Sequence, residues 1–83
     1  MTASDVRTSD FIARPGGVMT DEVGVITGEL TLRTEVHAGT VVHRVQYKDA
    51  DEWYVITGGT GPLPDGMDID TAHAEALAKW SAQ

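Results

Sequence analysis

Two histidines, His43 and His73, are the residues of this chain with the most potential for chemistry. His43 lies in a segment that alternates apolar and polar residues, and His73 lies on the apolar side of a predicted helix, so the two imidazoles can approach each other in the fold. With a carboxylate, such a pair can bind zinc or another divalent metal. Local H-x-H or H-x-x-x-H spacing is absent, and a metal site needs several matching features. We therefore predict no metal site and no cofactor. If a metal were bound, His43 and His73 would be the candidate ligands.

Two other stretches resemble ligand-binding motifs in composition only. The run Gly58-Gly59-Thr60-Gly61 follows a predicted strand as a phosphate-binding loop would, but Pro62 removes a backbone N–H and no Gly-Lys-Ser/Thr follows. The aspartates between positions 65 and 70 lack the spacing of a calcium-binding loop, and turn formation and helix capping account for them. We expect residues 58–68 to form a loop.

The sequence offers no support for nucleophilic catalysis. Ser4, Ser9 and Ser81 lie near the ends of the chain, where a reacting group is hardest to hold in place. Asp51 and Glu52 are neighbours in a predicted exposed hairpin, without an apolar pocket that would raise a carboxyl pKa. The chain has no cysteine, which excludes thiolate nucleophiles, disulfides and cysteine-bound metals. We predict that the protein is not an enzyme.

The elements that must position these residues are predicted to be strands followed by one helix. Residues 23–36 are rich in β-branched side chains, and Gly28 marks a change of alternation that indicates a bend or a break. Residues 41–48 and 52–57 alternate as two strands joined by a three-residue hairpin loop, 49–51. The pattern predicts an α+β fold, a small antiparallel meander of three to four strands with a C-terminal helix packed on one face.

The loop length determines the predicted register of the hairpin. With three loop residues, Lys48 faces Glu52 as a favourable charge pair and Val45 lies beside Val55, whereas a two-residue loop would set Asp49 against Glu52. One helix can cover only one face of the sheet. This register leaves an uncovered face that is more apolar than a solvated face should be, and such a patch often marks association. We predict it as the interaction surface, with residues Val42, Arg44, Tyr54 and Ile56.

The ends of the chain are predicted to differ in order. Residues 1–22 are weakly patterned and are expected to be a weakly ordered arm with a short edge strand near Phe11, while residues 23–83 form the domain. In the C-terminal helix, Asp70 has the properties of an N-cap. His73, Leu77 and Trp80 recur at the spacing of one helical face, which predicts the side that packs on the sheet.

Composition restricts the partners. The 83 residues are 41% hydrophobic and 23% charged, as in an ordinary globular domain, and the net charge of −7 repels phosphate backbones and anionic lipid. We therefore expect no direct nucleic-acid binding and no membrane association. The lack of cysteine and of an apolar N-terminal run favours a cytoplasmic location.

These features lead to three functional hypotheses. The first is a non-enzymatic protein-interaction module that self-associates, as a homodimer or other homo-oligomer, through the uncovered sheet face or an edge strand. The second is an acidic inhibitor or immunity-type protein that mimics nucleic-acid charge and binds a basic partner. The third is a small ligand- or metal-binding domain that uses His43, His73 and the glycine-rich stretch.

Overall fold

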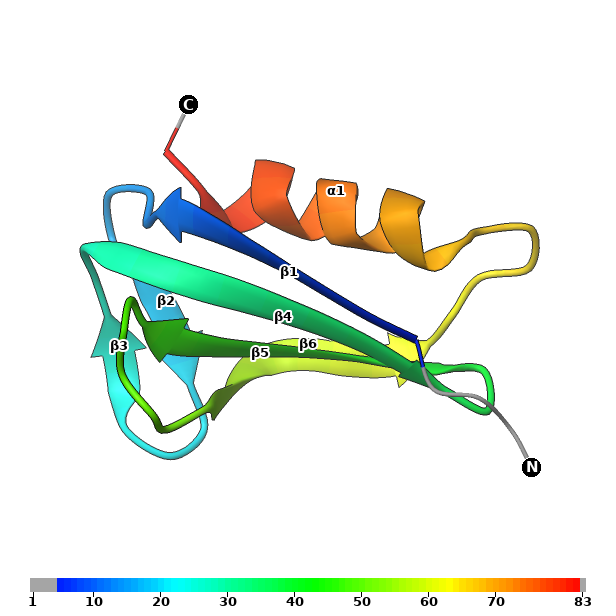
Figure 1. Cartoon of the computed structure of the whole chain (residues 1–83), viewed down its shortest axis with the longest axis horizontal. Coiled ribbons are helices and arrows are strands. Elements are labelled where there is room, and N and C mark those ends of the chain that lie inside the picture. The colour runs from blue at the N-terminus through cyan, green and yellow to red at the C-terminus, as the bar shows by residue number, and fades with distance from the viewer. Residues whose placement is uncertain (1–4, 83) are drawn as a thin grey trace.

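The structure, a computed structural model, describes residues 5–82 and has a small α+β fold. Within those residues, six antiparallel strands form one open sheet with the order β1-β4-β5-β6-β2-β3, and one helix follows at the C-terminus (Figure 1). The predicted class, antiparallel pairing and C-terminal helix are confirmed, and the sheet has more strands than the three or four expected. The elements are β1 Asp5–Ile12, β2 Val18–Thr20, β3 Gly24–Ile26, β4 Glu29–His37, β5 Thr40–Tyr47, β6 Tyr54–Pro62 and α1 Ile69–Trp80.

The N-terminal part contributes more regular structure than its sequence pattern predicted. Strand β1 pairs with β4 along its whole length, from Asp5↔Val36 to Ile12↔Glu29, and forms one edge of the sheet. Few of its side chains are apolar, so its sequence carries only a weak strand signal. Pairing with the backbone of β4 and the burial of Phe11 hold β1 in the sheet. Between β3 and β4, Gly28 adopts a φ of 91°, so the predicted break at this glycine is confirmed.

The predicted register of the β5–β6 hairpin was wrong by one residue. Val45 pairs with Tyr54 instead of lying beside Val55. The turn closes early, since Asp49 is left-handed with a φ of 67° and the N–H of Ala50 donates to the carbonyl of Tyr47 at 2.9 Å. A one-residue shift moves every side chain of a strand to the opposite face. Tyr54 therefore turns toward the core.

The glycine-rich stretch was also predicted wrongly, because it continues β6 to Pro62. The register shifts between Val42 and Arg44, after which Val42 pairs with Thr60. Such an irregularity lets a strand continue through glycines that composition alone assigns to a loop. A Cβ atom at Gly59 would lie 3.0 Å from the carbonyl oxygen of Ile56, a close contact that glycine avoids.

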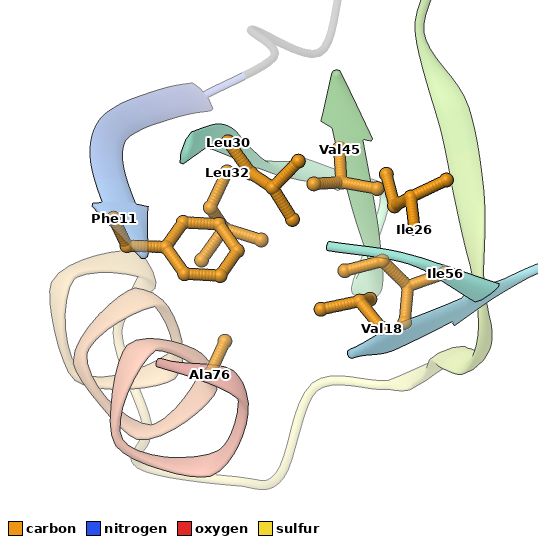
Figure 2. Packing of buried hydrophobic residues seen from close by; sticks show 8 residues of the cluster. All are labelled: Phe11, Val18, Ile26, Leu30, Leu32, Val45, Ile56 and Ala76. Atoms are coloured by element: carbon orange, nitrogen blue, oxygen red, sulfur yellow. The ribbon is translucent and has the colours of Figure 1, made fainter. Parts of the chain in front are cut away.

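The core lies inside the curved sheet, and α1 closes one side of it. Every one of the six strands contributes an apolar side chain to this core. Figure 2 shows these side chains pointing toward one another, with one alanine reaching in from the helix. Partly buried Tyr54, Leu77 and Trp80 pack against this cluster. The buried cluster consists of Phe11, Val18, Ile26, Leu30, Leu32, Val45, Ile56 and Ala76.

The helix begins two residues earlier than predicted. Asp68, not Asp70, is the N-cap and accepts a 2.8 Å hydrogen bond from the N–H of Thr71. Asp70 lies in the first turn and forms a 2.7 Å ion pair with Arg7 of β1. The predicted packing face is confirmed, since His73 is buried and the later apolar residues pack on the core. No helix within the described residues is long and apolar enough to cross a membrane.

Candidate binding cleft

A cleft of about 340 Å³ lies between α1 and the second half of β6. The helix contacts β1 and β4, and its C-terminal end is tied to β1 by a 2.7 Å hydrogen bond from the N–H of Ala82 to the carbonyl of Ile12 (Figure 1). This position leaves the inner surface of β5 and β6 open beside the helix. The cleft is lined by Val41, His43, Gly58, Gly59, Thr60, Gly61, Leu63, Pro64, Met67, Ala72, Glu75, Ala76, Lys79 and Trp80.

Along this cleft, β6 has a free backbone edge. Strand β2 pairs with β6 only at Thr20↔Ile56 in the described part of the chain, so the later residues of β6 pair only with β5. The N–H of Leu63 donates to the carbonyl of Gly39 at 2.8 Å. Bonded and non-bonded pairs alternate in an antiparallel ladder, so Gly61 bonds to β5 and Thr60 does not. Thr60 therefore directs both its backbone N–H and its carbonyl away from β5.

The glycines around Thr60 keep this edge accessible. Gly58, Gly59 and Gly61 carry no side chains, so Thr60 supplies the one side chain between positions 58 and 61. A glycine in a strand often marks a place where another backbone approaches closely. The edge thus combines unpaired backbone groups with little steric protection.

Beneath the cleft, four side chains from four elements form one hydrogen-bond network. The hydroxyl Oγ1 of Thr34, on β4, lies 2.7 Å from Nδ1 of His73 and 3.0 Å from Nδ1 of His43. The other ring nitrogen of His73, Nε2, lies 2.7 Å from Oγ of Ser9. A threonine hydroxyl has one hydrogen, so Thr34 donates to one imidazole and accepts from the other. The two imidazoles therefore hold complementary tautomers.

The surroundings favour the neutral form of both imidazoles. Burial lowers the pKa of His43 below its ordinary value, and the positive charges of a protonated His73 and of Lys79 act in the same direction. Burial also lowers the pKa of His73, with a smaller contribution from Arg7 and an opposing one from Asp70. When both rings are neutral, one Nδ1 can donate to the Thr34 hydroxyl while the other accepts its single hydrogen.

The fold thus brings the two predicted metal ligands together, but each of them contacts the hydroxyl of Thr34 between them. His43 and His73 both use Nδ1 to contact Thr34, so those nitrogens do not converge on an open position. Within residues 5–82, no group of three or more histidine, aspartate or glutamate side chains could hold a metal ion. The geometry is that of a structural network next to a cleft.

The four residues of the predicted interaction surface do not share one face. Val42 and Arg44 lie half-buried on the outer face of β5, while Tyr54 packs against the core from the inner face. Ile56 is 1% exposed and belongs to the core itself. The one-residue register error explains this difference, because it assigned Tyr54 and Ile56 to the wrong side of β6.

Around Val42 and Arg44, the outer face of the sheet carries a charge cluster. Glu35 is buried, and its carboxylate contacts Arg33, Arg44 and His37. Burial raises the pKa of Glu35, but hydrogen bonds from His37 and Arg33 and the charges of both arginines lower it on balance. Arg33 also lies 5.6 Å from the ring centre of Trp53. The charges of this cluster are therefore paired with one another.

Three contributors to the site escaped sequence reasoning. Thr34 was predicted only as a strand residue, Ser9 was set aside for its place near the N-terminus, and Thr60 was assigned to a loop. One signal was present: Thr34 shares its alternation with Leu30 and Leu32, and a hydroxyl at a core position needs a hydrogen-bond partner. No comparable signal marks Ser9 or Thr60.

Comparison with known proteins adds no family to this description. No protein-family model, no curated protein and no solved structure matches the chain. The features of this chain that bear on function are therefore the cleft, the free edge of β6 and the network beneath them.

Proposed function

We propose that the protein is a non-enzymatic interaction module that binds an extended segment of a partner protein. The segment adds as a strand to the free edge of β6, beside α1. The observation that supports this most directly is the backbone of Thr60, whose N–H and carbonyl point away from β5 at the margin of a cleft. Strand addition satisfies such groups, while alternate side chains of the added strand enter neighbouring pockets.

The cleft and the charge of the chain define the chemistry of the segment. Side chains of an added strand point alternately to its two faces, so one side chain enters the cleft and its neighbours face away. The walls are mainly apolar, with Met67, Ala76 and Trp80 among them, which favours an apolar anchor. The net charge of −7 favours basic residues on either side of that anchor.

A second copy of the chain is an alternative donor of the added strand. Edge strands pair readily with other edges, and β1 and β3 form the two edges of this sheet. In that case the protein is a homo-oligomer at micromolar concentration, and Thr60→Pro returns it to a monomer. A protein that remains monomeric and binds a basic extended peptide supports a separate partner instead.

The test uses a matched pair of substitutions at Thr60. Thr60→Pro removes the outward N–H of residue 60 but leaves the hydrogen bonds that its neighbours in β6 make to β5. Thr60→Ala removes only the hydroxyl and methyl groups of the side chain. Decapeptides selected from a random displayed library against the wild-type protein serve as probes, with affinity measured by titration calorimetry. We expect Thr60→Ala to retain binding and Thr60→Pro to lose roughly tenfold, because the hydrogen bond from the N–H of residue 60 disappears. Selected peptides that bind Thr60→Pro as tightly as wild type would refute strand addition.

A further inference from the structure

We infer that the anchor in the cleft is a phenol, a tyrosine side chain whose hydroxyl bonds to Nε2 of His43. This inference deepens the proposed function, since the tyrosine belongs to the segment that β6 receives. It makes a separate claim about the cleft floor, which a small phenol can test without any strand addition.

His43 supplies a polar ring nitrogen, Nε2, that is accessible at the cleft and has no protein partner among the described residues. The residue is 9% exposed and lines the cleft, so it lies at the floor rather than at the rim. Its Nδ1 is occupied by Thr34, and none of the described residues forms a hydrogen bond with Nε2. The ring is held edge-on against Trp80, with centroids 5.5 Å apart and planes at 65°. A pocket with apolar walls and one fixed polar group selects an apolar ligand with one polar tip.

The charges at the cleft favour a neutral tip over an ionised one. A carboxylate would approach Glu75 and the acidic surface of the protein, and an ammonium group would approach Lys79. Lys79 also lies 5.1 Å from the ring centre of Trp80, which helps to fix this wall. Next to an indole wall, an aromatic ligand ring gains edge or offset contacts that an aliphatic alcohol lacks. A phenol meets both requirements.

Through the hydrogen-bond network, ligand binding at His43 affects residues outside the cleft. A phenol that donates to Nε2 selects the tautomer of His43 in which Nδ1–H donates to Thr34. Thr34 then donates its hydroxyl hydrogen to Nδ1 of His73, and Nε2–H of His73 donates to Ser9. Binding at the floor therefore fixes the tautomer of His73 as well.

The experiment titrates the full-length wild-type protein with p-cresol at pH 7.5, with toluene as the matched ligand that lacks the hydroxyl. Nitrogen-15 NMR of labelled histidines follows the ring nitrogens. We expect p-cresol to shift Nε2 of His43 saturably and to bind roughly three- to tenfold more tightly than toluene, the difference that one hydrogen bond makes. Nuclear Overhauser contacts from p-cresol to the indole of Trp80 locate the ligand without any substitution.

Two variants separate this inference from the proposed function. His43→Leu should abolish the preference for p-cresol over toluene, and Thr31→Val, which lies outside the cleft, should leave that preference intact. Equal affinity for the two ligands, or an unshifted Nε2 of His43, overturns the inference and leaves strand addition standing. Retained p-cresol binding combined with peptides that ignore Thr60→Pro overturns strand addition and leaves the phenol site.

Discussion

Replacing Thr34 by valine tests the hydrogen-bond network that joins the helix to the sheet. Thr34 is 0% exposed, and its hydroxyl is the shared partner of two imidazoles, one on α1 and one on β5. Valine occupies nearly the same space, so the substitution removes the hydroxyl without opening a cavity. Any loss of stability therefore measures the missing hydrogen bonds alone.

The structure sets the size of the expected effect. Each buried nitrogen left without a partner costs about 1–3 kcal/mol, and water from the cleft can reach the ring of His43 and reduce its share. We expect Thr34→Val to lower the free energy of unfolding by about 2–3 kcal/mol. A chain of 83 residues has about 4–12 kcal/mol in total at typical values per residue, so the loss is easily measured.

Urea unfolding at pH 7.5, followed by tryptophan fluorescence, measures this loss. Thr31→Val is the matched control, because Thr31 lies on the same strand and donates to Asp10 at an exposed position. The control should change stability by about 0.5 kcal/mol or less. If Thr34→Val costs no more than Thr31→Val at an unchanged m-value, the network does not stabilise the fold and the reasoning is refuted.

Three further predictions concern pH, capping and the glycine-rich strand. The pKa values of the two buried histidines are lowered in the folded protein, so below the ordinary histidine pKa of about 6.5 the unfolded chain binds more protons than the folded one. The free energy of unfolding should therefore be highest above that pH and fall as the pH drops through the folded pKa values. A urea midpoint that rises from pH 7 to pH 5 would contradict this. Asp68→Ala should lower the thermal midpoint more than Asp70→Ala, because only Asp68 caps α1, and equal effects would count against that assignment. Gly59→Ala should cost about 1–3 kcal/mol in urea unfolding, since the added carbon meets backbone at 3.0 Å; Gly61→Ala, with no atom within 4 Å, is the control and should cost clearly less.

Sequence reasoning succeeded where a periodic pattern and burial agreed. The spacing of His73, Leu77 and Trp80 predicts the packed face of α1, and alternation places His43 on the inner face of β5, so the approach of the two histidines was foreseen. The break at Gly28 was foreseen for a similar reason, because the alternation itself changes there.

The errors arose where a tertiary partner decided the local structure. The turn after Tyr47 admits more than one loop length, and the charge pair expected between Lys48 and Glu52 was too weak a term to determine the register. Backbone pairing with β5 makes a strand of residues that propensity assigns to a loop, among them Thr60. Tyr54 and Ile56 were predicted on the wrong face of β6 for the first reason, and the free edge of β6 was missed for the second.

Amide hydrogen exchange at Thr60 tests the central claim of strand addition most directly. In the free protein, the N–H of Gly61 should be protected by its bond to β5, while the N–H of Thr60 should exchange much faster. On binding a selected decapeptide, the N–H of Thr60 should become protected by at least about tenfold. Protection of Thr60 equal to that of Gly61 in the free protein, or no gain of protection in the complex, would contradict the account.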